Sequence, residues 1–240
     1  MSSALPPLSA DLALFLDFDG TLVEIAARPE AVAVAAGLPE GLQARAAERG
    51  GALAVVSGRT IAELDHFLEP FTAAAAGVHG LELRLADGTR EDRTADADLT
   101  AIAAEMEALA EAHPALWIER KRGALALHYR AQTDLGPLCR AQLEPLVAAQ
   151  AGLTLLAGHC IFEVKSAAVN KGTALRRLMA DPPFAGKRPL FAGDDVTDED
   201  GILAAQALGG IGLKVGDQAS AADYRVASVA EFHRWLLAGL

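Results

Sequence analysis

The stretch Leu12–Thr21 constrains the fold of this chain more than any other. Five apolar residues, Leu12-Ala13-Leu14-Phe15-Leu16, run without alternation into Asp17-Phe18-Asp19-Gly20-Thr21. The run is too short to cross a membrane and has no polar face, which predicts a strand buried on both faces of a parallel sheet. Asp17 and Asp19 would then follow its carboxyl end, where open α/β sheets bind ligands. A plain polar turn is the alternative.

The rest of the chain alternates between helix and strand patterns on both sides of a central segment. Before it we expect a helix over 39–49, a buried strand over 52–56, a helix from Ile61 to about Glu69 opened by the capping box of Thr60 and Glu63, and a strand over 73–78. After it we expect a helix over 173–179, a strand over 189–193, a helix from about Asp198, a strand over 209–215 and a helix over 229–237. This order predicts a parallel sheet with crossover helices.

The central segment differs in kind. A hairpin around Asp87-Gly88 fits either part, and we assign it to the core. The segment that follows predicts helices over 100–113 and 134–150, each followed by two strands, at 116–120 and 124–130 and at 153–156 and 160–165. We therefore predict a Rossmann-like α/β core, residues 1–93 and 168–240, with an α+β domain inserted over residues 94–167.

Net charge and composition limit the classes of partner that the protein is expected to bind. The net charge of −11 at pH 7 disfavours nucleic acid and anionic membrane surfaces, because both are polyanions. Two cysteines are too few for a disulfide framework and suit a reducing compartment. The sequence shows neither a signal peptide nor a long apolar span. We expect a cytoplasmic monomer that acts on a small molecule.

Polar residues follow each apolar strand of the predicted sheet. Asp17, Asp19 and Asp194 would meet at one edge and repel one another unless a cation lies among them. Oxygen ligands without clustered His or Cys favour Mg²⁺. The Ser57 hydroxyl, the Lys171 ammonium and the backbone amides near Gly20 and Gly58 suit a phosphate group. Together these groups predict phosphoryl transfer through an aspartyl-phosphate, although each alone could be an ordinary loop or helix terminus.

Four motifs carry these groups: the one with Asp17 and Asp19, then those with Ser57, Lys171 and Asp194. In this order they resemble the motifs of the haloacid-dehalogenase-like phosphohydrolases. The resemblance implies that Asp17 is the nucleophile, that Asp19 is the general acid and base, and that Ser57 and Lys171 hold the phosphoryl oxygens. It also implies an Mg²⁺ site made by the Asp17 carboxylate, the Asp19 carbonyl and Asp194, with supporting acids Asp195 and Asp198. The insertion lies where this superfamily places a C2-type cap. Further substrate-binding residues are expected at the same edge: Gly20, Thr21, Gly58, Arg59 and His79.

The predicted strands of the insertion carry mixed charges. Alternation places side chains in pairs on one face of each strand: Glu119 with Lys121, His128 with Arg130, and Glu163 with Lys165. Acids and bases on one face suit a polyhydroxyl ligand, whose hydroxyl groups both donate and accept hydrogen bonds. A solvated outer face with cross-strand salt bridges explains the pattern as well.

A more specific resemblance, over nearly the full length, is to the trehalose-6-phosphate phosphatase family. It is carried by 17–25 (DFDGTLVEI), 56–59 (VSGR), 76–82 (AGVHGLE), 127–130 (LHYR), 162–165 (FEVK) and 193–199 (GDDVTDE). It implies that the six charged cap residues face a disaccharide. The chain departs from the family at Ser166, where proline is usual, and at His159, where lysine is common. The alternatives are another sugar-phosphate phosphatase, such as one for sucrose phosphate, and a non-catalytic sugar-phosphate-binding regulator.

Overall fold

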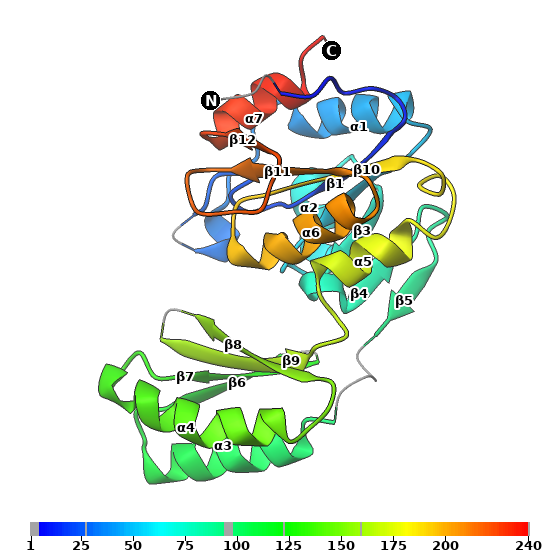
Figure 1. The fold of residues 1–240 in the computed structure, drawn as a ribbon. Coiled ribbons are helices and arrows are strands. Elements are labelled where there is room, and N and C mark those ends of the chain that lie inside the picture. The colour runs from blue at the N-terminus through cyan, green and yellow to red at the C-terminus, as the bar shows by residue number, and fades with distance from the viewer. Residues whose placement is uncertain (1–4, 27, 94–97, 122, 159, 240) are drawn as a thin grey trace. The chain divides into compact units, whose positions relative to one another are not determined.

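The computed structural model describes residues 5–26, 28–93, 98–121, 123–158 and 160–239. It divides into two compact units, one made of Met1–Asp92 with Asn170–Leu240 and the other of Arg93–Val169 (Figure 1). Thr94, at which we expected the insertion to begin, and His159 lie outside the described residues.

The first unit is built on one sheet with the strand order β12-β11-β10-β1-β2-β3-β4-β5. Its strands are β1 (Leu12–Leu16), β2 (Leu53–Val56), β3 (Ala74–Gly77), β4 (Glu82–Arg84), β5 (Arg90–Asp92), β10 (Arg188–Gly193), β11 (Ile211–Val215) and β12 (Tyr224–Val226). The strands from β12 to β3 pair in parallel, whereas β4 and β5 pair antiparallel. β1 lies between β10 and β2 and is buried along its whole length, as predicted.

Helices cover both faces of this sheet. Leu12, Leu14 and Leu16 pack with α1 (Leu38–Glu48), α2 (Ile61–Leu68) and α7 (Val229–Leu236), while Ala13 and Phe15 pack with α5 (Lys171–Leu178) and α6 (Glu199–Ala207) (Figure 1). Successive side chains of a strand point to opposite faces, so one apolar run serves both layers. The predicted parallel α/β core is confirmed.

Three local predictions need correction. The capping box of Thr60 and Glu63 is present, but α5 begins at Lys171, two residues earlier than expected, because the Asn170 side chain accepts a hydrogen bond from the Thr173 amide and caps the helix. The short edge strand β12 was not predicted. β7 ends at His128, and Arg130 lies in an exposed turn beyond it, which the Gln132 amide closes by donating to the Tyr129 carbonyl.

The second unit is a four-stranded antiparallel sheet with the order β6-β7-β9-β8, covered on one face by two helices (Figure 1). Its elements are α3 (Thr100–Ala112), β6 (Trp117–Lys121), β7 (Ala124–His128), α4 (Gly136–Ala148), β8 (Leu153–Gly158) and β9 (Ile161–Ser166). Leu125, Leu127, Phe162 and Val164 form a core with the helices. The residues between them along each strand therefore belong to the other face of the sheet.

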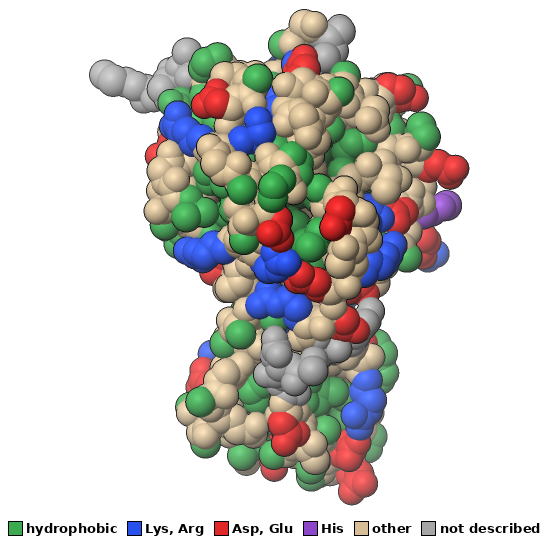
Figure 2. All heavy atoms as spheres, turned by 90° about the vertical axis from the view of Figure 1, so that its right-hand side faces the viewer, with side chains coloured by type: hydrophobic (Ala, Val, Ile, Leu, Met, Phe, Trp, Pro, Cys, Tyr) green, Lys and Arg blue, Asp and Glu red, His purple; other side chains and the backbone are tan. Residues whose placement is uncertain are grey.

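Within the described residues, no helix combines the length and apolarity that a membrane span requires. On the face shown in Figure 2, Lys and Arg side chains lie among Asp and Glu side chains.

Candidate active site

Asp17 lies directly after β1 and is buried, with its amide donating to the Ala192 carbonyl of β10. The Lys171 ammonium donates to Asp17 Oδ1 at 2.7 Å and to Asp198 Oδ1 at 2.6 Å. Although burial alone would lower the pKa of Lys171, the charges of Asp17 and Asp198 together raise it above its usual value. Lys171 is therefore a fixed positive charge beside the predicted nucleophile. Lys171 is the first residue of α5, and the start of this helix places its side chain at the site.

Asp198 has a larger structural role than the sequence indicated. Its Oδ2 accepts hydrogen bonds from the amides of Asp194 and Asp195, each at 3.0 Å, while its Oδ1 is held by Lys171. A Cβ at Gly193 would lie 2.2 Å from the Asp198 carboxyl carbon, so only glycine fits at the end of β10. Asp198 thus shapes the loop that presents Asp194. The capping box of Asp195 and Asp198 is the sequence signal that could have indicated this role.

Asp194 lies against the turn that follows Asp19. Gly20 has a φ of +84°, and a Cβ there would come within 2.2 Å of Asp194 Oδ2. Glycine both adopts the left-handed conformation and leaves room for the carboxylate. The loops after β1 and β10 approach each other closely here, which explains why glycine follows Asp19.

The carboxylates of Asp17, Asp194 and Asp198 each place an oxygen within 4.8 Å of the others. Burial, reinforced by Asp198 and Asp195, raises the pKa of Asp194 to about 6, and burial raises that of Asp17 well above its usual value. Lys171 contacts Asp17 and Asp198 only, among the described ion pairs. Crowded oxygen donors with one neighbouring cation fit a divalent metal such as Mg²⁺. Because the hydrogen bonds above already engage both Asp198 oxygens, Asp17 and Asp194 are the better ligands.

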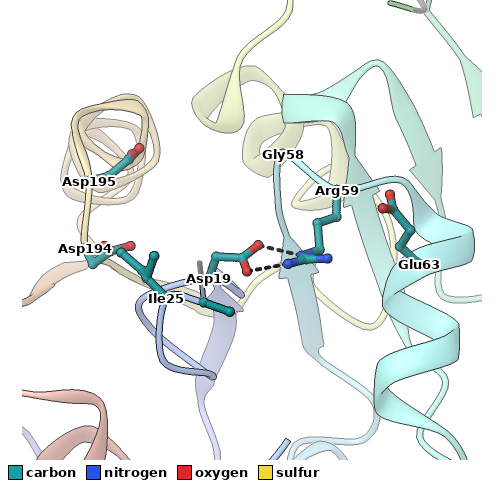
Figure 3. Close-up of a pocket in the computed structure, with 8 residues that line it drawn as sticks. Asp19, Ile25, Gly58, Arg59, Glu63, Asp194 and Asp195 are labelled. Carbon is teal, nitrogen blue, oxygen red and sulfur yellow. Dashed lines mark hydrogen bonds and ion pairs between the residues drawn. The ribbon is translucent and has the colours of Figure 1, made fainter. Parts of the chain in front are cut away.

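Asp19 does not join that cluster. Its two carboxylate oxygens accept from Arg59 Nε at 2.7 Å and from Arg59 Nη2 at 2.8 Å (Figure 3). The guanidinium lies 5.4 Å from the Phe18 ring centre and 4.9 Å from that of Phe67. Planar pairing with a carboxylate and contact with two rings hold Arg59 in one orientation. Arg59, predicted as a substrate-binding residue, is here a partner of the predicted general acid.

The loops after β2 and β3 are tied together. The His79 amide donates to the Ser57 carbonyl and the Val78 amide to the Arg59 carbonyl, each at 2.8 Å, while Ser57 Oγ accepts from the Arg59 amide. A Cβ at Gly58 would lie 2.8 Å from the His79 ring. His79 has a φ of +56°, uncommon for a residue with a side chain. These contacts place His79 beside the SGR motif.

Thr21 is buried in the turn after β1, and within the described part of the chain its hydroxyl has no hydrogen-bond partner. In the first unit, one pocket of about 440 Å³ opens at this edge of the sheet. Figure 3 shows the residues of this edge that line it: Asp19, Ile25, Gly58, Arg59, Glu63, Asp194 and Asp195. Five of the predicted site residues therefore line this pocket, namely Asp19, Gly58, Arg59, Asp194 and Asp195, whereas Asp17, Ser57 and Lys171 are not part of its lining.

The charged residues of the second unit form a network on the sheet face opposite α3 and α4. His128 Nε2 lies 2.9 Å from Glu119 Oε2, and Lys121 Nζ donates to Glu163 Oε2 at 2.7 Å. The register pairs Glu119 and Glu163 with Ala126, which places both on one face, and it places the buried Lys165 beside Ala124 on that face. The structure brings five of the six predicted residues together. Arg130 remains in its turn.

A buried Asp at the end of the first strand, a lysine from a distant helix and two further acids define the class of haloacid-dehalogenase-like phosphatases. The fold agrees: a phosphatase of the haloalkanoate (HAD) superfamily from Bacteroides thetaiotaomicron superposes with a TM-score of 0.65 at 20% identity, over 98% of this chain and 97% of that one. At that identity the likeness concerns the fold.

The particular family follows from closer relatives. The trehalose-phosphatase family model matches residues 15–230, and the chain belongs to this family. It is 37% identical to the trehalose-6-phosphate phosphatase of Escherichia coli, over 96% of this chain and 87% of that protein. An Aspergillus fumigatus trehalose-6-phosphate phosphatase structure is 27% identical, with a TM-score of 0.76 over 98% of this chain and 97% of that one.

Proposed function

We propose that this protein is an Mg²⁺-dependent phosphatase that hydrolyses trehalose 6-phosphate to trehalose and phosphate through an aspartyl-phosphate on Asp17. The observation that carries the proposal is the contact of Lys171 with both Asp17 and Asp198 beside the Asp194 carboxylate. Family membership and the near-full-length relatives that bear this enzyme's name support the choice of substrate.

The chemistry follows from the chain's own groups. An Asp17 oxygen attacks phosphorus, the bond to the sugar oxygen breaks, and Asp19 donates the proton that the departing sugar alkoxide requires. Water then attacks the aspartyl-phosphate, its proton passes to Asp19, and the bond between phosphorus and Asp17 breaks. Since Arg59 engages both Asp19 oxygens in this structure, Asp19 must turn away from Arg59 before it transfers a proton.

Asp17, Asp194 and the Asp19 carbonyl would hold the Mg²⁺, which supplies positive charge for the phosphoryl oxygens. Lys171 and Ser57 act on the same oxygens, Lys171 by charge and Ser57 by its hydroxyl. Asp195 and Asp198 support this loop, as the capping box and the hydrogen bonds of Asp198 to two amides suggest.

We assign residues 94–167 the role of a specificity cap domain, and residues 1–93 with 168–240 the role of the catalytic core. The polar face of its sheet would bind the sugar hydroxyl groups through Glu119, Lys121, His128, Glu163 and Lys165. Lys121 Nζ donates to Glu163 at 2.7 Å and His128 Nε2 lies 2.9 Å from Glu119 Oε2, so hydrogen-bonding groups already lie side by side across the face. Arg130 would need to reach the ligand from its turn. The protein is proposed to act as a cytoplasmic monomer.

Phosphate release tests the function directly. The purified protein is expected to release phosphate from trehalose 6-phosphate with Mg²⁺ present and to lose that activity in excess EDTA, with recovery when Mg²⁺ is restored. Sucrose 6-phosphate and glucose 6-phosphate measured in parallel identify the sugar. Faster turnover of either would assign a different sugar-phosphate phosphatase, and no turnover of any would favour a binding protein.

The cap residues give a second prediction. Glu119→Ala and Lys165→Ala are each expected to lower kcat/KM for trehalose 6-phosphate by about 10²-fold, because each removes a charged hydrogen-bonding group from the polar face. Turnover of p-nitrophenyl phosphate, which has no sugar, should change less than about threefold. Arg140→Ala is the matched control, because Arg140 pairs with Glu144 on α4. Equal losses on both substrates would remove these residues from sugar recognition.

A further inference from the structure

Trp117, the first residue of β6, is a large apolar side chain for which the sequence predicted no role. It is 58% exposed, and it is the only aromatic among the large apolar side chains that are exposed in the described ranges. Alternation along β6 places it on the same face as Glu119 and Lys121. Single exposed apolar side chains are common on protein surfaces, but this indole adjoins the charged side chains that we propose to bind the sugar.

The indole is also held in place. Trp117 lies opposite His128 in the sheet register, and the two ring centres are 4.4 Å apart at an interplanar angle of 35°. The His128 ring is in turn fixed by the 2.9 Å contact of its Nε2 with Glu119. One side of the indole therefore rests on His128, while more than half of its surface remains accessible. A rigid aromatic plane with neighbouring carboxylate and ammonium groups is typical of a binding surface for a ligand with both apolar and polar faces.

We propose that Trp117 is a stacking platform for a pyranose ring of the substrate. A pyranose has one face rich in C–H groups and a rim of hydroxyl groups. The partly positive C–H hydrogens are attracted to the negative face of the indole. The hydroxyl groups would then lie near the side chains of Glu119, Lys121 and Glu163. This inference rests on the proposed function and extends it, since it adds an apolar determinant to residues that recognise only hydroxyl groups.

Kinetics separate this role from one in which Trp117 only maintains the fold. Trp117→Ala is expected to raise KM for trehalose 6-phosphate about tenfold with little change in kcat, and to leave p-nitrophenyl phosphate turnover unchanged. Trp117→Phe keeps a ring and should restore most of the affinity. Arg120→Ala is the control, since Arg120 lies on the opposite face of β6 and pairs with Glu107. Equal effects on both substrates, or an unchanged KM, would overturn the proposal.

A direct binding measurement keeps the Trp117 side chain in place. The chain has two tryptophans, and Trp235→Phe leaves Trp117 as the single emitter. Trp235 lies in α7, where its Nε1 donates to the Pro6 carbonyl. Titration of Trp235→Phe with trehalose should shift or quench the emission saturably, whereas Trp117→Phe should show no response. Unchanged emission of Trp117 at concentrations of trehalose that inhibit the enzyme would overturn the platform. A native enzyme that does not hydrolyse trehalose 6-phosphate would instead refute the proposed function.

Discussion

Asp17→Asn is expected to abolish phosphate release while leaving the fold at least as stable as that of the native chain. The amide cannot attack phosphorus, so turnover should fall by about 10⁴-fold or more. Asn at this position also removes one negative charge from a buried cluster that holds three carboxylates around Lys171. Because burial raises the pKa of Asp17, its charged form is disfavoured there, and the melting temperature without Mg²⁺ should stay equal or rise.

Opposite changes in activity and stability distinguish this result from simple unfolding. Thermal unfolding and trehalose 6-phosphate turnover are measured on the same preparations. Asp223→Asn is the control, because the Asp223 carboxylate accepts a hydrogen bond from the Gly212 amide but lies outside the acidic cluster. It should retain native turnover. Activity of Asp17→Asn within tenfold of the native value would refute the nucleophile.

Local sequence predicted those parts of the site that depend on one strand and its following turn. The apolar run before Asp17, the polar residues after each strand and the capping box of Thr60 and Glu63 are all short-range patterns, and the structure contains each of them. Parallel pairing then brings the strand ends to one edge, whatever the side chains there do. The alternation of charged residues in the insertion likewise placed five of them on one sheet face.

The features of the site that the sequence did not predict involve contacts between side chains far apart in the sequence. The pairing of Arg59 with Asp19 spans 40 residues, and neither motif indicates which way the two side chains turn. Asp198 could equally have been a solvated acid at a helix start, but its hydrogen bonds to two amides depend on the path of the loop after β10. Trp117 carried no prediction, because a single apolar residue at a strand start does not indicate which face of the sheet it joins. Its exposure depends on which face of the sheet the helices cover.

Lys171→Met is expected to destabilise the protein and to reduce turnover by about 10³-fold or more. Lys171 is the cation that contacts Asp17 and Asp198 among the described ion pairs, and all three side chains are nearly inaccessible. Removing one partner of a buried ion pair leaves uncompensated charge, which typically costs about 3–5 kcal/mol of unfolding free energy. Denaturant unfolding at pH 8 without Mg²⁺ measures this loss. Lys187→Met is the control, because Lys187 is half-buried and its ammonium donates to the Ala10 carbonyl, outside the acidic cluster.

Two further measurements assign the loss to charge rather than to packing. Added Mg²⁺ should raise the melting temperature of Lys171→Met more than that of the native protein, because a divalent ion binds more strongly where the carboxylates lack their ammonium. In the double variant Asp17→Asn, Lys171→Met, one uncompensated carboxylate is removed, so stability should recover relative to Lys171→Met by more than Asp17→Asn changes it in the native protein. Additive effects of the two substitutions would contradict an electrostatic origin. If the coupling has the expected sign, the lysine beside the predicted nucleophile also permits two buried acids, Asp17 and Asp198, to share one site with the half-buried Asp194.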